Sequence, residues 1–252
     1  MQVKEAEKII EKLFAFCSRE SMLLQLEGLN EGLSLLMQNL QESAATSNVQ
    51  LQQYYKQQKE GQDHYLLQHV NGNLISLQFY DIITQKLEHI FGAHLMLIKD
   101  LRKSMEAEND GEDTDSYLLI YPELMCLHHA LLKLIRVEYI REISQVESHF
   151  ELVSPDQIPS QAVDIQLGFF KITIEKHLDI LIREVSDMII TIAIQEGEAV
   201  SQLKSQKFQD VLSLFTMNSE REVFSDIFQH KGFMPLLNVV TEVSEDDDVE
   251  LF

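Results

Sequence analysis

Apolar residues recur along most of this chain at intervals of three and four, which is the period of an amphipathic α-helix. The pattern predicts a first helix over residues 3–18 and a second over residues 20–43. The apolar face of the first helix is expected to contain Ile9, Ile10, Leu13 and Phe14. Alternation of apolar and polar residues, the pattern of a half-buried β-strand, is almost absent, so the chain is predicted to be helical.

The middle of the chain contains two expected interruptions. A Gln-rich stretch, residues 48–70, either prolongs the second helix or frays from it. Residues 71–73 read Asn-Gly-Asn, a strong turn signal, so we expect a break there and a long helix over residues 74–105 after it. Residues 107–116, AENDGEDTDS, are acidic and poor in apolar side chains, which is typical of an exposed linker.

The second half repeats this helical pattern. A long helix is expected over residues 121–152, and the two prolines of 153–161 close it, because proline disfavours helix at the residue before it. A further helix is expected from 161 to about 202, and residues 204–217 either continue it or start a new one. A weaker amphipathic segment covers residues 221–237.

These elements predict an all-α fold, an elongated antiparallel helix bundle. The chain has only 9 Gly and 4 Pro residues, which also favours long helices over a sandwich or barrel. We expect the bundle to span residues 1–217, with halves at 1–106 and 117–217, and an accessory helix or linker to follow over 218–240. Residues 241–252 are expected to be an acidic binding tail.

Two of the predicted helices contain similar stretches. LQFYDIITQKLEHI, residues 77–90, is similar to LGFFKITIEKHLDI, residues 167–180, with Leu, Phe and Ile repeated in register. The two stretches are either equivalent helices of an internally duplicated helical hairpin or unrelated amphipathic helices of similar composition.

Composition and charge narrow the classes of function. The chain has 41 acidic and 20 basic residues, a net charge of −21, so its surface repels nucleic acid and anionic membranes. Two cysteines without metal-type spacing suit a reducing compartment. The N-terminus has charges where a signal peptide has an apolar core, and the most apolar run, DMIITIAI, is too short to span a bilayer. We therefore expect a cytoplasmic protein that binds neither nucleic acid nor membrane.

One side of the helix over residues 77–90 carries a pair of polar residues. The apolar residues of this helix cluster in one direction, and Asp81 and Gln85 lie on the opposite side, one turn apart. That side also contains Gln78, Glu88 and Gly92. We expect the pair to be exposed, either as an ordinary solvated helix surface or as a site for a partner. In the similar stretch, the corresponding residues are Lys171 and Glu175.

The run from Phe79 to Gln85, F-Y-D-I-I-T-Q, resembles the active-site helix of the CheZ family, whose motif reads roughly F-Q-D-L-T-G-Q. Members of that family are chemotaxis phosphatases that dephosphorylate the response regulator CheY. The family is built of long-helix bundles and ends in an acidic amphipathic peptide that docks on CheY. This chain ends similarly in SEDDDVELF, an acidic run with a terminal aromatic residue.

The resemblance implies roles for the site residues. Gln85 would orient the water that attacks the phospho-aspartate, and Asp81 would pair with a lysine of the regulator. Phe79 and Glu88 would help to bind this partner. The tail would tether the regulator through Asp246, Asp247, Asp248, Val249, Leu251 and Phe252. The phosphoryl group and a Mg²⁺ ion would both belong to the regulator, so the chain would need no cofactor of its own.

The main alternative is a non-catalytic helical adaptor that binds a response regulator or a flagellar component. A second fragment, KFQDVLSLF, contains the Phe-Gln-Asp of the motif at 208–210, but Leu214 stands in place of the glutamine and cannot orient water. The oligomeric state stays open between a monomer and a homodimer, because the chain has enough helices to form a four-helix bundle alone.

A metal-binding bundle is a more distant alternative. Adjacent residues on a helix diverge by about 100°, so His128 and His129 cannot both bind one ion. The Glu-x-x-His spacing of di-iron bundles does not occur, so no metal site is expected. The remaining helical histidines are expected at the boundary or surface of the bundle: His89, His94, His149 and His177.

Overall fold

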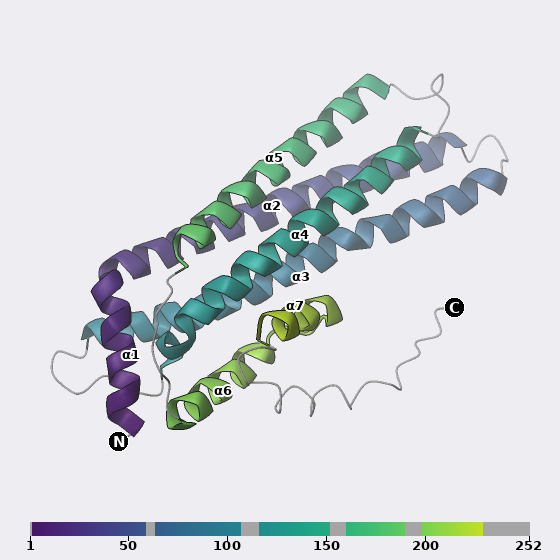
Figure 1. Ribbon diagram of the computed structural model, residues 1–252. Coiled ribbons are helices and arrows are strands. Elements are labelled where there is room, and N and C mark those ends of the chain that lie inside the picture. The colour runs from purple at the N-terminus through teal and green to yellow at the C-terminus, as the bar shows by residue number, and fades with distance from the viewer. Residues whose placement is uncertain (1, 59–63, 107–115, 152–159, 190–197, 229–252) are drawn as a thin grey trace, which may run out of the picture. The chain divides into compact units, whose positions relative to one another are not determined.

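The computed structural model describes residues 2–58, 64–106, 116–151, 160–189 and 198–228 (Figure 1). Every regular element in these ranges is a helix, so the prediction of an all-α helix bundle is confirmed for the described part of the chain. The elements are α1 Gln2–Phe16, α2 Arg19–Gln58, α3 His64–Glu106, the 3₁₀ helix η1 Tyr117–Ile120, α4 Tyr121–Glu151, α5 Ser160–Asp187, α6 Glu198–Leu212 and α7 Asn218–Phe228.

The predicted break at residues 71–73 is wrong. Helix α3 begins at His64 and continues through the Asn-Gly-Asn sequence. Relative to alanine, an asparagine inside a helix costs up to about 0.7 kcal/mol and a glycine about 1 kcal/mol. A helix of 43 residues can tolerate this penalty. The unfavourable helix propensity of these three residues is therefore outweighed by the long helical pattern on both sides of them.

The predicted helix over residues 161–202 is divided. Helix α5 ends at Asp187, a turn follows, and α6 begins at Glu198. The run after Asp187, MIITIAI, contains four isoleucines and one threonine, whose branched Cβ atoms lose side-chain freedom in a helix. Period alone did not reveal this loss of helix propensity.

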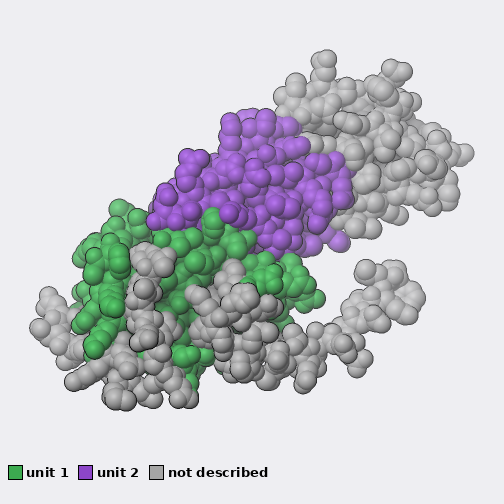
Figure 2. All heavy atoms as spheres, viewed as in Figure 1, with its two compact units in different colours: residues 1–26, 92–130, 188–252 green, residues 27–91, 131–187 purple. Residues whose placement is uncertain are grey.

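The described chain forms two compact units, and neither follows the expected halves (Figure 2). Unit 1 contains residues 1–26, 92–130 and 188–252, and unit 2 contains residues 27–91 and 131–187. Each unit therefore draws on both sides of the segment that we expected to be the linker. The boundary falls within α2, α3 and α4, so these long helices contribute to both units.

Unit 2 is a four-helix bundle made of parts of α2, α3, α4 and α5 (Figures 1 and 2). Asn39 of α2 contacts His177 of α5, with 3.1 Å between the amide nitrogen and Nδ1. Seven residues earlier, Gly32 lies against Leu181 of α5. The numbering in α5 falls as that in α2 rises, so these two helices are antiparallel, as expected.

The burial pattern does not follow the similarity between residues 77–90 and 167–180. Phe79 of the first stretch is 6% exposed, whereas Phe169 at the matching position of the second is 65% exposed. Ile90 is fully buried, and its counterpart Ile180 is half exposed. The two stretches therefore turn different faces to the core of unit 2, and duplication in this register has no support from packing.

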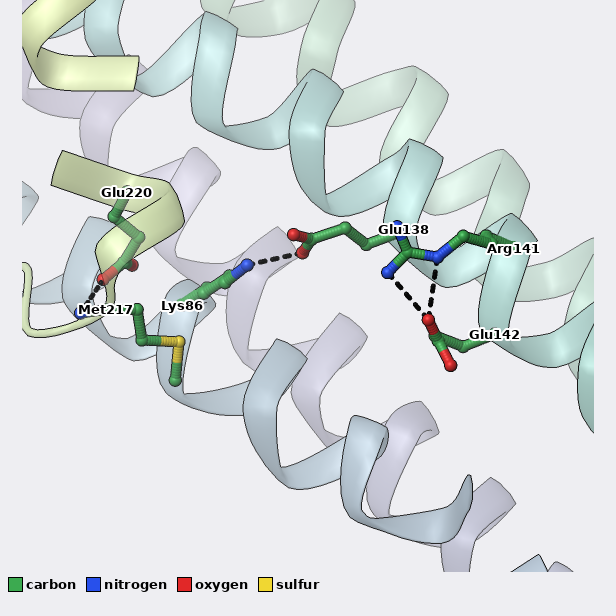
Figure 3. Close-up of polar contacts among 6 residues, drawn as sticks. All are labelled: Lys86, Glu138, Arg141, Glu142, Met217 and Glu220. Carbon is green, nitrogen blue, oxygen red and sulfur yellow. Dashed lines mark hydrogen bonds and ion pairs between the residues drawn. The ribbon is translucent and has the colours of Figure 1, made fainter. Parts of the chain in front are cut away.

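Unit 1 is built around α1, η1 and α6, which contact one another. Asp100 near the end of α3 accepts hydrogen bonds from Ser116 Oγ and from the backbone N–H of Tyr117. This carboxylate holds the start of η1 to α3. At the start of α7, Glu220 accepts a hydrogen bond from the N–H of Met217, which is one half of a capping box (Figure 3).

Some expected segments lie outside the described residues. Residues 107–115 of the acidic linker and the whole tail, 241–252, belong to this group. The tail contains the expected partner-binding residues Asp246, Asp247, Asp248, Val249, Leu251 and Phe252. Ser116, which we placed in the linker, is instead buried and caps η1, since its Oγ accepts from the N–H of Leu118.

One helical span in the described part of the chain, Tyr117–Gln145, is long and apolar enough to cross a membrane by length and composition. Its most apolar window is 67% buried inside the protein. Core helices of soluble proteins pass the same test, and the burial is of that kind.

Candidate functional site

The polar strip on α3 is exposed, as its position opposite the apolar face predicts. We use this name for Gln78, Asp81, Gln85 and Glu88, all of which are exposed. Asp81 and Gln85 lie one turn apart and point the same way from the helix. Gly92, the last expected member, is partly buried. The helix thus presents a carboxylate and an amide side by side to solvent.

The opposite face of α3 is buried in unit 2. It contains Phe79, Tyr80, Ile83, Leu87 and Ile90, none more than 6% exposed. The placement of Phe79 in a partner-binding surface is wrong, because its ring packs 4.0 Å from the ring of Tyr80 and 6.1 Å from that of Tyr139. Phe79 anchors α3 in the bundle. Of Phe79 and Glu88, the two residues of α3 expected to help Asp81 and Gln85 in binding a partner, only Glu88 is accessible.

Two polar contacts flank this apolar face, one buried and one partly buried. On one side, the hydroxyl of Tyr80 lies 2.8 Å from Ser43 Oγ of α2. On the other, Lys86 Nζ donates to Glu138 Oε2 of α4 at 2.5 Å (Figure 3). We call these the flanking contacts. Neither was predicted, although Lys86 stands three residues after Ile83 and four before Ile90, a spacing that assigns it to the buried side.

Ile82 adds an apolar element beside the polar strip. It is 45% exposed and lies between Asp81 and the side of the helix that carries Lys86. An amide, a carboxylate and an isoleucine together make a surface that can dock on a folded partner and offer one hydrogen-bonding group. The residues of the strip include no hydroxyl or thiol, so this surface can position a reactant but cannot form a covalent intermediate through either group.

A buried histidine pair lies elsewhere, in unit 1. His94 Nε2 of α3 and His128 Nδ1 of α4 are 3.0 Å apart, and both side chains are fully buried. The expectation that His94 is a boundary or surface residue is therefore wrong. Burial lowers the pKa of His94 from 6.5 to about 3. The pKa of His128 is also lowered, by burial and by the adjacent His94.

Within the described ranges, the histidine pair does not belong to a cluster of side chains that could hold a metal ion. Among the described residues, no group of three or more His, Cys, Asp or Glu side chains is placed to hold an ion. His128 Nε2 has no hydrogen-bond partner in this part of the structure. The pair is a neutral, hydrogen-bonded element of the core.

The second copy of the motif fragment is used for packing in unit 1. Phe208 is buried, and Asp210 accepts a hydrogen bond from the hydroxyl of Tyr117. Leu214, which replaces the glutamine, lies against Gly92, with its Cδ1 3.7 Å from the position of a Cβ there. These contacts give Asp210 and Leu214 structural roles.

Helix α5 presents a different kind of surface. Phe169, Ile172 and Ile180 are about half exposed or more, and they follow one another at helical spacing. Lys176 and Arg183 lie on the same face and are exposed. This face between Phe169 and Arg183, which we call the α5 stripe, combines apolar and basic side chains, whereas the polar strip of α3 is polar and acidic.

Comparisons with protein-family models, with curated proteins and with solved structures found no match for this chain.

Proposed function

We propose that the chain is a CheZ-like phosphatase that removes the phosphoryl group from the phospho-aspartate of a CheY-like response regulator. The observation that carries this proposal is the joint exposure of Asp81 and Gln85, one turn apart, on a helix whose other face is buried. A helix fixed in this way can dock on a partner and insert side chains into the partner's own site. The resemblance of the run from Phe79 to Gln85 names that partner.

Gln85 would perform the chemical role. Its amide oxygen can accept a hydrogen bond from water, and its NH₂ can donate to a phosphoryl oxygen, without adding charge to an anionic site. Phosphoryl transfer depends largely on positioning and electrostatics, so one oriented water in line with the scissile bond is a large part of the catalysis.

Asp81 would fix the docking register. Its carboxylate would pair with a lysine of the regulator, and this charge-assisted contact would orient the helix before the water is placed. Glu88, one turn beyond Gln85, would add a second acidic contact at the edge of the same surface. The Mg²⁺ ion and the phosphoryl group would belong to the regulator, which suits a cytoplasmic enzyme with no cofactor of its own.

The test is phosphate release from a CheY-like regulator that has been phosphorylated with acetyl phosphate in Mg²⁺. The wild-type chain should accelerate release, Gln85→Ala should abolish the acceleration, and Asp81→Asn should weaken it mainly through binding. Gln41→Ala is the matched control, because Gln41 is also an exposed glutamine on a long helix of unit 2. Loss of activity in both glutamine variants, or no acceleration by the wild type, contradicts the proposal.

The α5 stripe favours a second candidate, the non-catalytic adaptor. An apolar face with two cations suits a binding partner whether or not any chemistry follows. Binding of the unphosphorylated regulator separates the two functions. An adaptor binds equally well after Gln85→Ala and loses affinity when Phe169 and Ile172 are both replaced by serine.

A further inference from the structure

Lys86 is a lysine in an unusual place. It follows Gln85 directly, yet it is 3% exposed while Gln85 faces solvent. Lysines are almost never fully buried unless they are paired. Here the Nζ atom reaches Glu138 on α4, whose side chain is 17% exposed, so the pair links two helices of unit 2 (Figure 3).

Stability alone does not explain this pair. Taking two charges out of water offsets much of their mutual attraction, and apolar replacements of buried ion pairs are often neutral or stabilising. The best-attested use of buried polar contacts is to select one packing register among several of similar stability.

The two flanking contacts together define how α3 is rotated in the bundle. At about 100° per residue, Tyr80 and Lys86 fall about 60° to either side of the centre of the buried face. Tyr80 is held by Ser43 of α2, and Lys86 is held by Glu138 of α4. Rotation of α3 in either direction breaks one of the two contacts. The polar strip lies opposite the centre of the buried face, so its direction is set by the same two contacts.

We propose that Lys86 is a positioning residue, which through its ion pair with Glu138 fixes the rotation of α3 and so aims Gln85 at the reacting phosphoryl group. This inference rests on the proposed function. A side-chain tip lies about 5–6 Å from a helix axis, so a rotation of about 20° moves it by roughly 2 Å. Misplacement of a catalytic group by about 1 Å can lower a rate by about 10²-fold.

The structure provides a matched control for this idea. Arg136 and Asp179 form a second ion pair between helices of unit 2, joining α4 to α5 at 2.6 Å. Both partners are substantially exposed, and neither helix carries the polar strip. Arg136→Met removes one positive charge, as Lys86→Met does, and should leave the rotation of α3 unchanged.

The experiment compares steady-state phosphatase kinetics of Lys86→Met and Arg136→Met, with thermal unfolding of each variant measured in parallel. Lys86→Met should lower kcat by about 10- to 100-fold, with KM for the phosphorylated regulator within a few-fold of wild type. Arg136→Met should keep kcat within twofold. The exchanged pair, Lys86→Glu with Glu138→Lys, should recover most of the lost kcat, which a general loss of packing would not allow.

Two milder variants keep the test decisive if Lys86→Met does not fold. Glu138→Gln retains a hydrogen-bond acceptor and Tyr80→Phe removes the other flanking contact, and each should lower kcat more than Arg136→Met does. If the wild type is active, Gln85→Ala is inactive and folded Lys86→Met keeps the wild-type kcat, only the positioning role of Lys86 is overturned. A wild type without phosphatase activity overturns both the proposed function and this inference.

Discussion

Residues 77–90 of α3 and 167–180 of α5 are similar in sequence but differ in which side chains are buried. When they are aligned by sequence, the offset is 90 residues, and buried Phe79 then corresponds to exposed Phe169. An offset of 91 matches the burial instead, because Ile83, Leu87 and Ile90 then correspond to Ile174, Leu178 and Leu181, all buried.

A shift of one residue rotates a helix face by about 100°. The same residue types can therefore form a core face in one helix and an exposed stripe in the next. In α3, the shift leaves Asp81 and Gln85 facing solvent. In α5, it leaves Phe169, Ile172 and Ile180 outside the core. Similarity of composition between two amphipathic helices thus says little about which side each one presents.

The largest expected effect tests this difference directly. Phe79→Ala should destabilise the protein by about 3–5 kcal/mol, because it removes a buried ring that packs against two tyrosines. Phe169→Ala should change the free energy of unfolding by no more than about 0.5 kcal/mol. Urea unfolding followed by circular dichroism measures both. Equal losses would show that the two phenylalanines occupy equivalent environments after all.

A second difference concerns titration, because the buried face of α3 continues to His94 while that of α5 contains aliphatic residues. The folded pKa of His94, about 3, is below the unfolded value near 6.5, so the unfolded state binds more protons between these values. The stabilisation by neutral His94 is therefore present above about pH 6.5 and lost as the pH falls towards 3. At pH 5.5 the loss from this residue is about 1.4 kcal/mol relative to pH 7.5.

The control for the pH prediction separates the histidine pair from the many carboxylates. The double variant His94→Leu with His128→Leu should lose less stability than the wild type between pH 7.5 and 5.5. His177→Asn, which removes a half-buried imidazole of α5 and leaves the pair intact, should behave as the wild type does. Parallel pH curves for the wild type and the double variant would contradict a neutral, buried pair.

The smallest expected effect concerns glycine-to-alanine substitutions in α5 and α2. A Cβ at Gly168 would meet nothing within 4 Å, so Gly168→Ala should stabilise the protein by about 0.5–1 kcal/mol through helix propensity. A Cβ at Gly32 would stand 2.8 Å from Leu181 Cδ2, a buried side chain that would have to move. Gly32→Ala should therefore show no gain, and thermal unfolding of the two variants should differ by about 1 kcal/mol. Gly28→Ala, also in open space, is a second reference.

The helical spacing of apolar residues was sufficient to predict the all-α fold, the extents of α1 and α4, and the exposure of Asp81 and Gln85. Helix ends were harder to predict, because local signals differ in free energy from the helix by only about 1 kcal/mol or less per residue. The helix continued through the turn signal at 71–73, but it ended before the β-branched run that follows Asp187. The compact units could not be predicted, since long helices shared between units leave no boundary in the sequence.

The polar groups of the core were missed for a different reason. Lys86 and His94 both stand at helical spacing with buried isoleucines and leucines, but their residue types argued for the surface. A buried lysine or histidine depends on a partner far away in the sequence, here Glu138 and His128. Helical spacing assigns such residues to the core. Only the packing of the helices shows which partner offsets the free-energy cost of burying them.

The carboxylate of Asp100 has a consequence for how α3 and η1 are joined. It accepts hydrogen bonds from Ser116 Oγ and from the N–H of Tyr117, so α3 and the start of η1 are linked by folded structure as well as by the chain between them. Hydrogen bonds to charged groups contribute about 1.5–3 kcal/mol each. Asp100→Ala, which removes the acceptor for both, should therefore weaken the link between α3 and η1 more than Asp100→Asn, which keeps one acceptor oxygen.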